Sequence, residues 1–123
     1  MQRTNDAKAD PAGRLWFGTM PLFEQFGECM GDLYCCDGVT CKKNLSGCRI
    51  PNGMAWNASA DIMYFIDSPE RCISAFDFNK ASGKISNRRE VVKIDMGVPD
   101  GMTIDTDGNL WVAHWGGGCA AKY

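Results

Sequence analysis

An internal repeat is the feature that most constrains the fold of this sequence. Three segments share one pattern, since 47 positions separate Asn5 from Asn52 and 48 positions separate Asn52 from Asp100. An aromatic residue follows each of these positions after 11 or 12 residues, and these aromatics are Trp16, Tyr64 and Trp111. A period of about 40 to 50 residues indicates one supersecondary unit repeated along the chain. We expect the three aromatics, together with Trp56, to pack in the core between neighbouring units.

Each repeat unit has the pattern of a β-hairpin. Turn-forming residues such as Asp107-Gly108 separate stretches of alternating apolar residues, and residues 10–13 form a similar break in the first unit. No stretch has a sustained helical period. Further strands are therefore expected at residues 32–36, 39–45, 73–78 and 90–94, with turns at residues 37–38 and 79–83. About four strands per repeat is typical of β-propeller blades, so the sequence predicts an all-β chain of that class.

Composition and charge exclude several classes of protein. The 123 residues are 45% hydrophobic, which is enough for a packed core. Thirteen basic and fifteen acidic residues give a net charge of -2, and the scattered basic residues argue against a nucleic-acid partner. No apolar run approaches the roughly 20 residues of a membrane span, and the polar start lacks the apolar core of a signal peptide. We therefore expect a cytoplasmic protein with no membrane partner.

Five of the seven cysteines crowd together, at Cys29, Cys35, Cys36, Cys41 and Cys48. Their spacing leaves a secreted disulfide-rich module as one alternative. A zinc cluster is another, although no C-x2-C pair occurs and the single histidine, His114, is distant in sequence. The odd total and the strand-like surroundings of Cys72 and Cys119 favour mostly free thiols. Adjacent residues on a strand face opposite sides of the sheet, so no disulfide is expected between Cys35 and Cys36.

Polar residues open each repeat unit. Because Asn5, Asn52 and Asp100 occupy equivalent places, radial repetition would bring their side chains to the same end of a central channel. Two amides and one carboxylate supply the oxygen ligands that hard cations prefer. The alternative is that each residue only caps a turn, since Asn-Gly and Asp-Gly are common turn dipeptides.

The repeated motifs resemble a known family, that of senescence marker protein 30 (regucalcin), the gluconolactonases and the luciferin-regenerating enzyme. The resemblance rests on residues 3–20, 50–68 and 85–117, and it is weakest over residues 21–48. It implies a six-bladed β-propeller. About two and a half blades would lie within these 123 residues as one partial domain, with units starting near residues 5, 52 and 100 and with the N- and C-terminal blades missing.

The same resemblance implies metal-dependent hydrolysis of a sugar lactone, a small-molecule substrate. It assigns Asn52 and Asp100 as ligands of a divalent cation, which is calcium or zinc in the family, with manganese or magnesium also compatible. Asp100 would also be the catalytic base. Arg3 and Asn5 match the residues that contact substrate hydroxyls. The cation would polarise the lactone carbonyl and acidify the attacking water.

Departures from the family pattern leave the activity of this segment open. The family's third protein ligand is a glutamate that lies before the region covered here. After Met20, only Glu24 stands where relatives carry acidic residues over the site, and Ala7 replaces the usual glycine. A non-catalytic calcium-binding or regulatory propeller protein is therefore an alternative to a lactonase.

Overall fold

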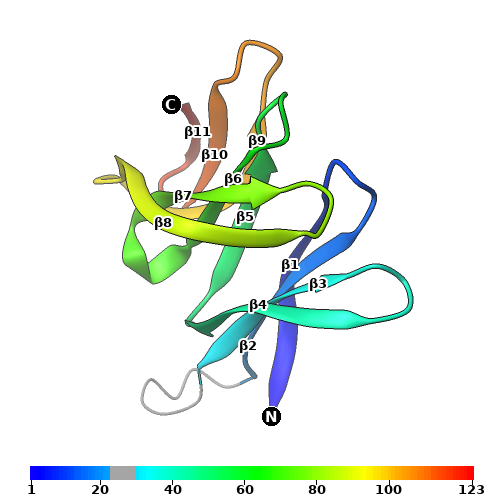
Figure 1. The fold of residues 1–123 in the computed structure, drawn as a ribbon. Coiled ribbons are helices and arrows are strands. Elements are labelled where there is room, and N and C mark those ends of the chain that lie inside the picture. The colour runs from blue at the N-terminus through cyan, green and yellow to red at the C-terminus, as the bar shows by residue number, and fades with distance from the viewer. Residues whose placement is uncertain (23–29) are drawn as a thin grey trace.

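The computed structural model describes residues 1–22 and 30–123, which form three antiparallel sheets (Figure 1). Glu24 and Cys29, which were considered above, lie outside the described residues. The strands are β1 (Gln2–Ala9), β2 (Leu15–Pro21), β3 (Gly31–Cys36), β4 (Cys41–Cys48), β5 (Pro51–Trp56), β6 (Ile62–Asp67), β7 (Cys72–Asn79), β8 (Lys84–Lys93), β9 (Val98–Ile104), β10 (Leu110–Trp115) and β11 (Cys119–Lys122). The short 3-10 helix η1 (Ser68–Glu70) follows β6. The prediction of an all-β chain is confirmed.

The sheets stand side by side, each with one strand toward a common centre (Figure 1). Their strand orders are β1-β2-β3-β4, β5-β6-β7-β8 and β9-β10-β11, so every sheet is a meander that begins at one edge. The strands at these edges, β1, β5 and β9, are neighbours, because β5 packs on β1 on one side and on β9 on the other. The first strand of each repeat unit therefore faces the same central space, which is the arrangement of propeller blades.

Two of the predicted strands have different limits in the structure. Residues 39–40 belong to a turn rather than to β4, because the Asp37 carboxylate accepts hydrogen bonds from the backbone N–H groups of Val39 and Thr40. Strand β8 begins at Lys84, six residues before the predicted start. It pairs with β7 along nearly its whole length, but its residues are mostly exposed and polar. An outer strand of this kind has no hydrophobic pattern from which to predict it.

Two apolar cores join the three sheets. Trp16 is fully buried between the first and second sheets, where its ring meets Trp56 and Phe78 edge to face. The second core contains Ile66, Ile73 and Val112, with Tyr64 packed at its margin. The prediction of core positions is confirmed for Trp16 and Trp56 and in part for Tyr64. It is wrong for Trp111, which is 41% exposed because none of the described strands covers that face of β10.

Side-chain caps close the hairpins at a second set of equivalent positions, Asp10, Asn57 and Asp105, again 47 and 48 residues apart. The Asp10 carboxylate accepts hydrogen bonds from the backbone N–H of Ala12 and Arg14, the Arg14 side chain and the Trp16 indole. Asp105 likewise binds the Asp107 and Asn109 backbone and the Trp111 indole. The Asp10 and Asp105 caps therefore join their turns to the aromatic residue of the same unit. Asn57 instead binds residues of its own turn and the start of β6, through the backbone N–H groups of Asp61 and Ile62 and the side chains of Ser59 and Asp61.

Replacing Asp10 by asparagine is expected to lower the free energy of unfolding at pH 7 by about 2 kcal/mol, since the partly buried Arg14 side chain loses its charged, buried acceptor. Burial acts to raise the pKa of Asp10, but the hydrogen bonds from Trp16 and Arg14 outweigh it and lower the pKa. A carboxyl with a lowered pKa stabilises the fold above its unfolded pKa and loses this effect as the pH falls through its folded pKa. The difference between variant and wild type should therefore shrink below about pH 4.

Urea unfolding at pH 7 and pH 3 measures this difference. Asp95→Asn, at an exposed carboxylate, is the control and should leave the free energy of unfolding within about 0.5 kcal/mol of wild type. An Asp10→Asn effect of equal size at both pH values would show that the lost charge is not its cause.

Most of the cysteines that the structure describes are free, and two are bonded to each other. A disulfide joins Cys36 and Cys41, which pair directly across β3 and β4. The expectation of mostly free thiols therefore has to be corrected at these two residues, whose proximity follows from the tight turn between them. Cys35 faces the first core and is free, so the prediction that it is not bonded to Cys36 is confirmed. The remaining free cysteines among the described residues are Cys48, Cys72 and Cys119.

Burial makes the thiol of Cys48, the least exposed of these free cysteines, unreactive. Cys48 is 2% exposed, and burial, with a further contribution from Asp67, raises its pKa to about 12. A thiol with this pKa is not ionised near neutral pH, and it is the thiolate that reacts or binds metal. Within residues 1–22 and 30–123, no group of three His, Cys, Asp or Glu side chains is arranged to hold a metal ion.

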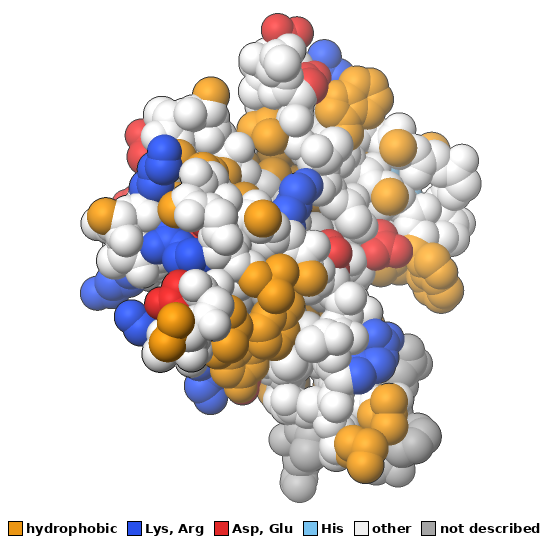
Figure 2. Space-filling view, turned by 90° about the vertical axis from the view of Figure 1, so that its right-hand side faces the viewer, with side chains coloured by type: hydrophobic (Ala, Val, Ile, Leu, Met, Phe, Trp, Pro, Cys, Tyr) orange, Lys and Arg blue, Asp and Glu red, His pale blue; other side chains and the backbone are white. Residues whose placement is uncertain are grey.

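Charged and apolar side chains are interspersed on the face drawn in Figure 2, where Lys and Arg lie in several separate places. None of the helical residues that the structure describes forms a segment with the length and apolar character required to cross a membrane.

Candidate functional site

A β-bulge interrupts the first strand of every sheet at the same repeat position. In β1, Asn5 and Asp6 stand opposite the single residue Gly18, because Thr4 pairs with Thr19 and Ala7 pairs with Phe17. In β5 and β9 the corresponding register shifts fall at residues 52–53 and 100–101. Bulges re-aim side chains and are common next to active sites. The first residue of each bulge is one of the three polar residues that open the repeat units.

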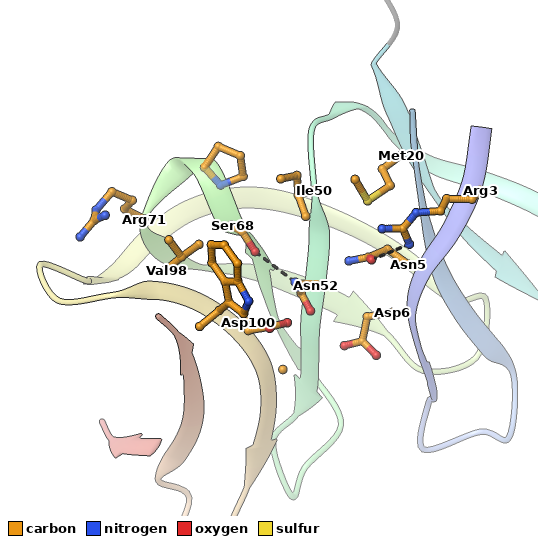
Figure 3. A pocket seen from close by; sticks show the side chains of 13 residues that line it. Arg3, Asn5, Asp6, Met20, Ile50, Asn52, Ser68, Arg71, Val98 and Asp100 are labelled. Carbon is orange, nitrogen blue, oxygen red and sulfur yellow. Dashed lines mark hydrogen bonds between the residues drawn. The ribbon is translucent and has the colours of Figure 1, made fainter. Parts of the chain in front are cut away.

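The bulges border one pocket of about 750 Å³ at the centre of the three sheets (Figure 3). All four residues singled out from the sequence line it, namely Arg3, Asn5, Asn52 and Asp100. They come from three different sheets, so the structure brings together residues up to 97 positions apart, from 3 to 100. Their chemical roles stay predictions.

Close approach of β5 and β9 makes this convergence possible. A Cβ atom placed on Gly53 would lie 2.5 Å from the Met102 Cβ, 2.6 Å from the Met102 backbone nitrogen and 2.8 Å from the Asp100 carbonyl oxygen. Only a residue without a side chain fits between these strands. Asn52 and Asp100 are therefore held next to one another by the glycine that follows Asn52.

The Asn52 side chain has a defined orientation. It is 7% exposed, and its Nδ2 donates a hydrogen bond of 3.1 Å to the Ser68 hydroxyl (Figure 3). Since the amide nitrogen is engaged with Ser68, the other end of the amide, Oδ1, is the atom that remains for the pocket. An amide oxygen presented in this way is a suitable cation ligand.

The Asn5 amide is oriented by different partners. Its Nδ2 donates to the Pro51 carbonyl at 3.0 Å, and its Oδ1 accepts from Arg3 Nη1 at 2.9 Å. Both ends of this amide are thus hydrogen-bonded to the protein, whereas Asn52 is bonded only through its nitrogen. Asn52 is therefore the better candidate for a cation ligand. Arg3 is exposed, and its Nε and Nη2 groups donate to none of the described residues. These groups are suitable donors for oxygens of a bound molecule.

Asp100 supplies a carboxylate to the pocket. It is partly buried and follows the fully buried Pro99. Among residues 1–22 and 30–123, no side chain or backbone N–H donates a hydrogen bond to this carboxylate. Its oxygens are therefore available to a cation or to a proton on a bound molecule.

The donor atoms suit a hard divalent cation in kind, since Asn52 Oδ1 and the Asp100 carboxylate are both oxygens and the carboxylate supplies charge. They are fewer than the six or more ligands of calcium. Further ligands would have to be water, substrate or other protein oxygens. The residues that the structure describes therefore fit part of a cation site.

The pocket also contains residues to which no role was assigned from the sequence, among them Asp6, Ser68, Arg71 and Trp115. Asp6 could have been identified from the sequence, because the other two repeat units have glycines, Gly53 and Gly101, at the equivalent position. Asp6 alone carries a side chain there. Ser68 occupies none of the three repeated polar positions and had no such signal. Its place in the pocket depends on η1, which turns the chain back toward β5 and β9.

The whole chain, residues 1–123, matches the family described as SMP-30/Gluconolactonase/LRE-like region. It is 43% identical over 123 residues to an uncharacterised protein of Sulfolobus acidocaldarius, with 98% of this chain and 44% of that protein covered. It is 40% identical over 124 residues to regucalcin of Sus scrofa, with 94% and 41% covered. The chain thus spans less than half the length of these relatives.

Solved structures agree with this match. A luciferin-regenerating enzyme superposes with a TM-score of 0.93 at 39% identity, covering 98% of this chain and 42% of the enzyme. Regucalcin of Agrobacterium tumefaciens, described as a calcium-binding protein, superposes with a TM-score of 0.86 at 25% identity, covering 99% and 42%. The prediction of a partial β-propeller is confirmed by these likenesses.

Proposed function

Because the chain belongs to the SMP-30/gluconolactonase/LRE-like family, we propose that it forms part of a metal-dependent hydrolase acting on a sugar lactone. The observation that carries the proposal is the convergence of three equivalent bulges on one pocket, with the Asn52 Oδ1 and the Asp100 carboxylate both available there. Turn capping alone does not account for this arrangement, since the hairpins are capped by Asp10, Asn57 and Asp105 instead.

Each residue has a distinct task in the proposed reaction. Asn52 and Asp100 would hold a divalent cation, which when bound supplies Lewis-acid polarisation of the lactone carbonyl and acidifies water. Asp100 would accept the proton of the attacking water. Arg3 would donate hydrogen bonds to substrate oxygens, and Asn5 would keep the Arg3 guanidinium in place through its own oxygen. The product of hydrolysis would be an open-chain sugar acid.

Arg3→Ala and Asn52→Ala are expected to affect different steps. Asn52→Ala removes an oxygen ligand and should weaken calcium binding at least about tenfold. Arg3→Ala removes hydrogen-bond donors to the substrate and should raise KM for gluconolactone about tenfold. A guanidinium has no acceptor atom, so Arg3 takes no part in cation binding. Calorimetry with calcium and hydrolysis followed by proton release measure the two effects in the full natural chain.

The two variants serve as controls for each other. Calcium affinity should stay within about twofold of wild type in Arg3→Ala, since none of its atoms is a ligand. Equal calcium affinity in wild type and Asn52→Ala would remove Asn52 from the cation site.

A non-catalytic calcium-binding protein is the second candidate function. It is favoured by the Agrobacterium tumefaciens relative, which is described as calcium-binding. Tight calcium binding by the full natural chain without hydrolysis of any sugar lactone would support this candidate over the lactonase.

A further inference from the structure

We propose that Ser68 is a positioning residue that fixes the Asn52 amide with its oxygen toward the pocket. The inference deepens the proposed function and rests on it in one respect, namely that the oxygen so presented binds a cation. Ser68 is 2% exposed and begins η1, directly after β6. It belongs to none of the repeated positions discussed above.

The backbone of Ser68 is fixed independently of Asn52. Its N–H donates to the Ile50 carbonyl at 3.0 Å, and its carbonyl accepts from the Arg71 N–H at 3.2 Å. The preceding residue, Asp67, accepts from the backbone N–H groups of Arg49 and Ile50, both at 2.8 Å. Three of these hydrogen bonds join the residues before β5 to the start of η1, and the fourth closes η1 itself.

The direction of the Ser68 hydroxyl proton follows from its second partner. The hydroxyl lies 2.6 Å from the Pro99 carbonyl oxygen, and a carbonyl can only accept. Ser68 must therefore donate its single proton to Pro99, which leaves only lone pairs for Asn52. The group that faces Ser68 at 3.1 Å must be the Asn52 NH2.

This chain of hydrogen bonds determines which atom of the Asn52 amide faces the pocket. A flipped amide would place Asn52 Oδ1 against the lone pairs of the Ser68 oxygen, where neither atom can donate. The flipped state therefore leaves the buried Asn52 Oδ1 facing Ser68 without a donor, which is costly. Through Pro99 the same hydroxyl contacts the peptide directly before Asp100. One serine thus orients the first proposed ligand and anchors the strand that carries the second.

Ser68→Ala in the full natural chain tests the proposal, with Ser74→Ala as the matched control. Ser74 is also buried, at 3%, and its hydroxyl accepts from Arg88 Nε on the outer part of the same sheet. Calorimetry with calcium should show affinity reduced about tenfold in Ser68→Ala and within about twofold of wild type in Ser74→Ala. In an Asn52→Ala background, Ser68→Ala should cost less calcium affinity than it does in wild type, because only the contact with Pro99 is then lost.

A second readout needs no metal. The side-chain NH2 protons of Asn52, followed by NMR in apo protein, should exchange with water faster in Ser68→Ala than in wild type or Ser74→Ala. If Ser68→Ala does not fold, Ser68→Cys, with a weaker acceptor, should give the same change to a smaller extent. Unchanged Asn52 exchange, or an equal loss of calcium affinity with and without Asn52, would overturn the positioning role. If wild type binds no calcium, the proposed function fails and the exchange measurement alone decides the inference.

Discussion

Replacing Asp100 by asparagine is expected to lower kcat for gluconolactone hydrolysis at least about a thousandfold in the full natural chain. The variant removes the only carboxylate charge of the proposed ligand pair and the proposed proton acceptor in one change. Calcium affinity should fall with it, since an amide supplies an oxygen ligand without charge. Hydrolysis followed by proton release, together with calorimetry, measures both effects.

Asp107→Asn is the matched control, because Asp107 is exposed in the turn between β9 and β10, on the same hairpin but outside the pocket. It should keep kcat within about twofold of wild type. Wild-type turnover in Asp100→Asn would contradict the proposed base, and unchanged calcium affinity would remove Asp100 from the cation site.

Gly53→Ala is expected to lower the free energy of unfolding by about 3 kcal/mol. The added methyl group would meet the Met102 backbone nitrogen and the Asp100 carbonyl oxygen at distances that real contacts do not reach, so β5 and β9 must move apart. Backbone atoms cannot turn away as a flexible side chain can. Urea unfolding measures the loss, and calcium binding should weaken because Asn52 and Asp100 separate.

Gly101 offers a control at the same repeat position. A Cβ atom there meets nothing within 4 Å, and neither glycine has a positive φ. Gly101→Ala should therefore change the free energy of unfolding by less than about 0.5 kcal/mol. Equal destabilisation by both substitutions would show that loss of a glycine, rather than crowding between the strands, is responsible.

The hairpins and their repetition were predictable from local sequence. Alternation and turn residues act over a few positions, so the strands that became β1, β2, β5, β6, β9 and β10 could be recognised by pattern. Equivalence within the repeat also placed Asn5, Asn52 and Asp100 in one group, since a radial fold converts equal spacing along the chain into a common direction. The family resemblance added the expected chemistry.

The side-chain orientations inside the site depend on contacts that local patterns do not contain. The Asn52 amide is oriented by Ser68, 16 positions away, and Ser68 is oriented by Pro99, 31 positions further on. The Cys36–Cys41 disulfide depends on the register of β3 and β4. The exposure of Trp111 depends on which faces of the sheets are covered by other strands. The bulges that turn three polar residues toward one pocket are themselves register shifts between strands.

The sequence by itself thus determined the type of fold and the group of polar residues, because strand periodicity and repeat spacing are properties of the chain. Only the tertiary structure decided that Asn5 is hydrogen-bonded at both ends of its amide, to Arg3 and Pro51, while Asn52 keeps its oxygen for the pocket. Both residues are asparagines at equivalent positions. They differ in which neighbours the packed sheets supply, and hydrogen bonds to those neighbours determine which atom of each amide stays free.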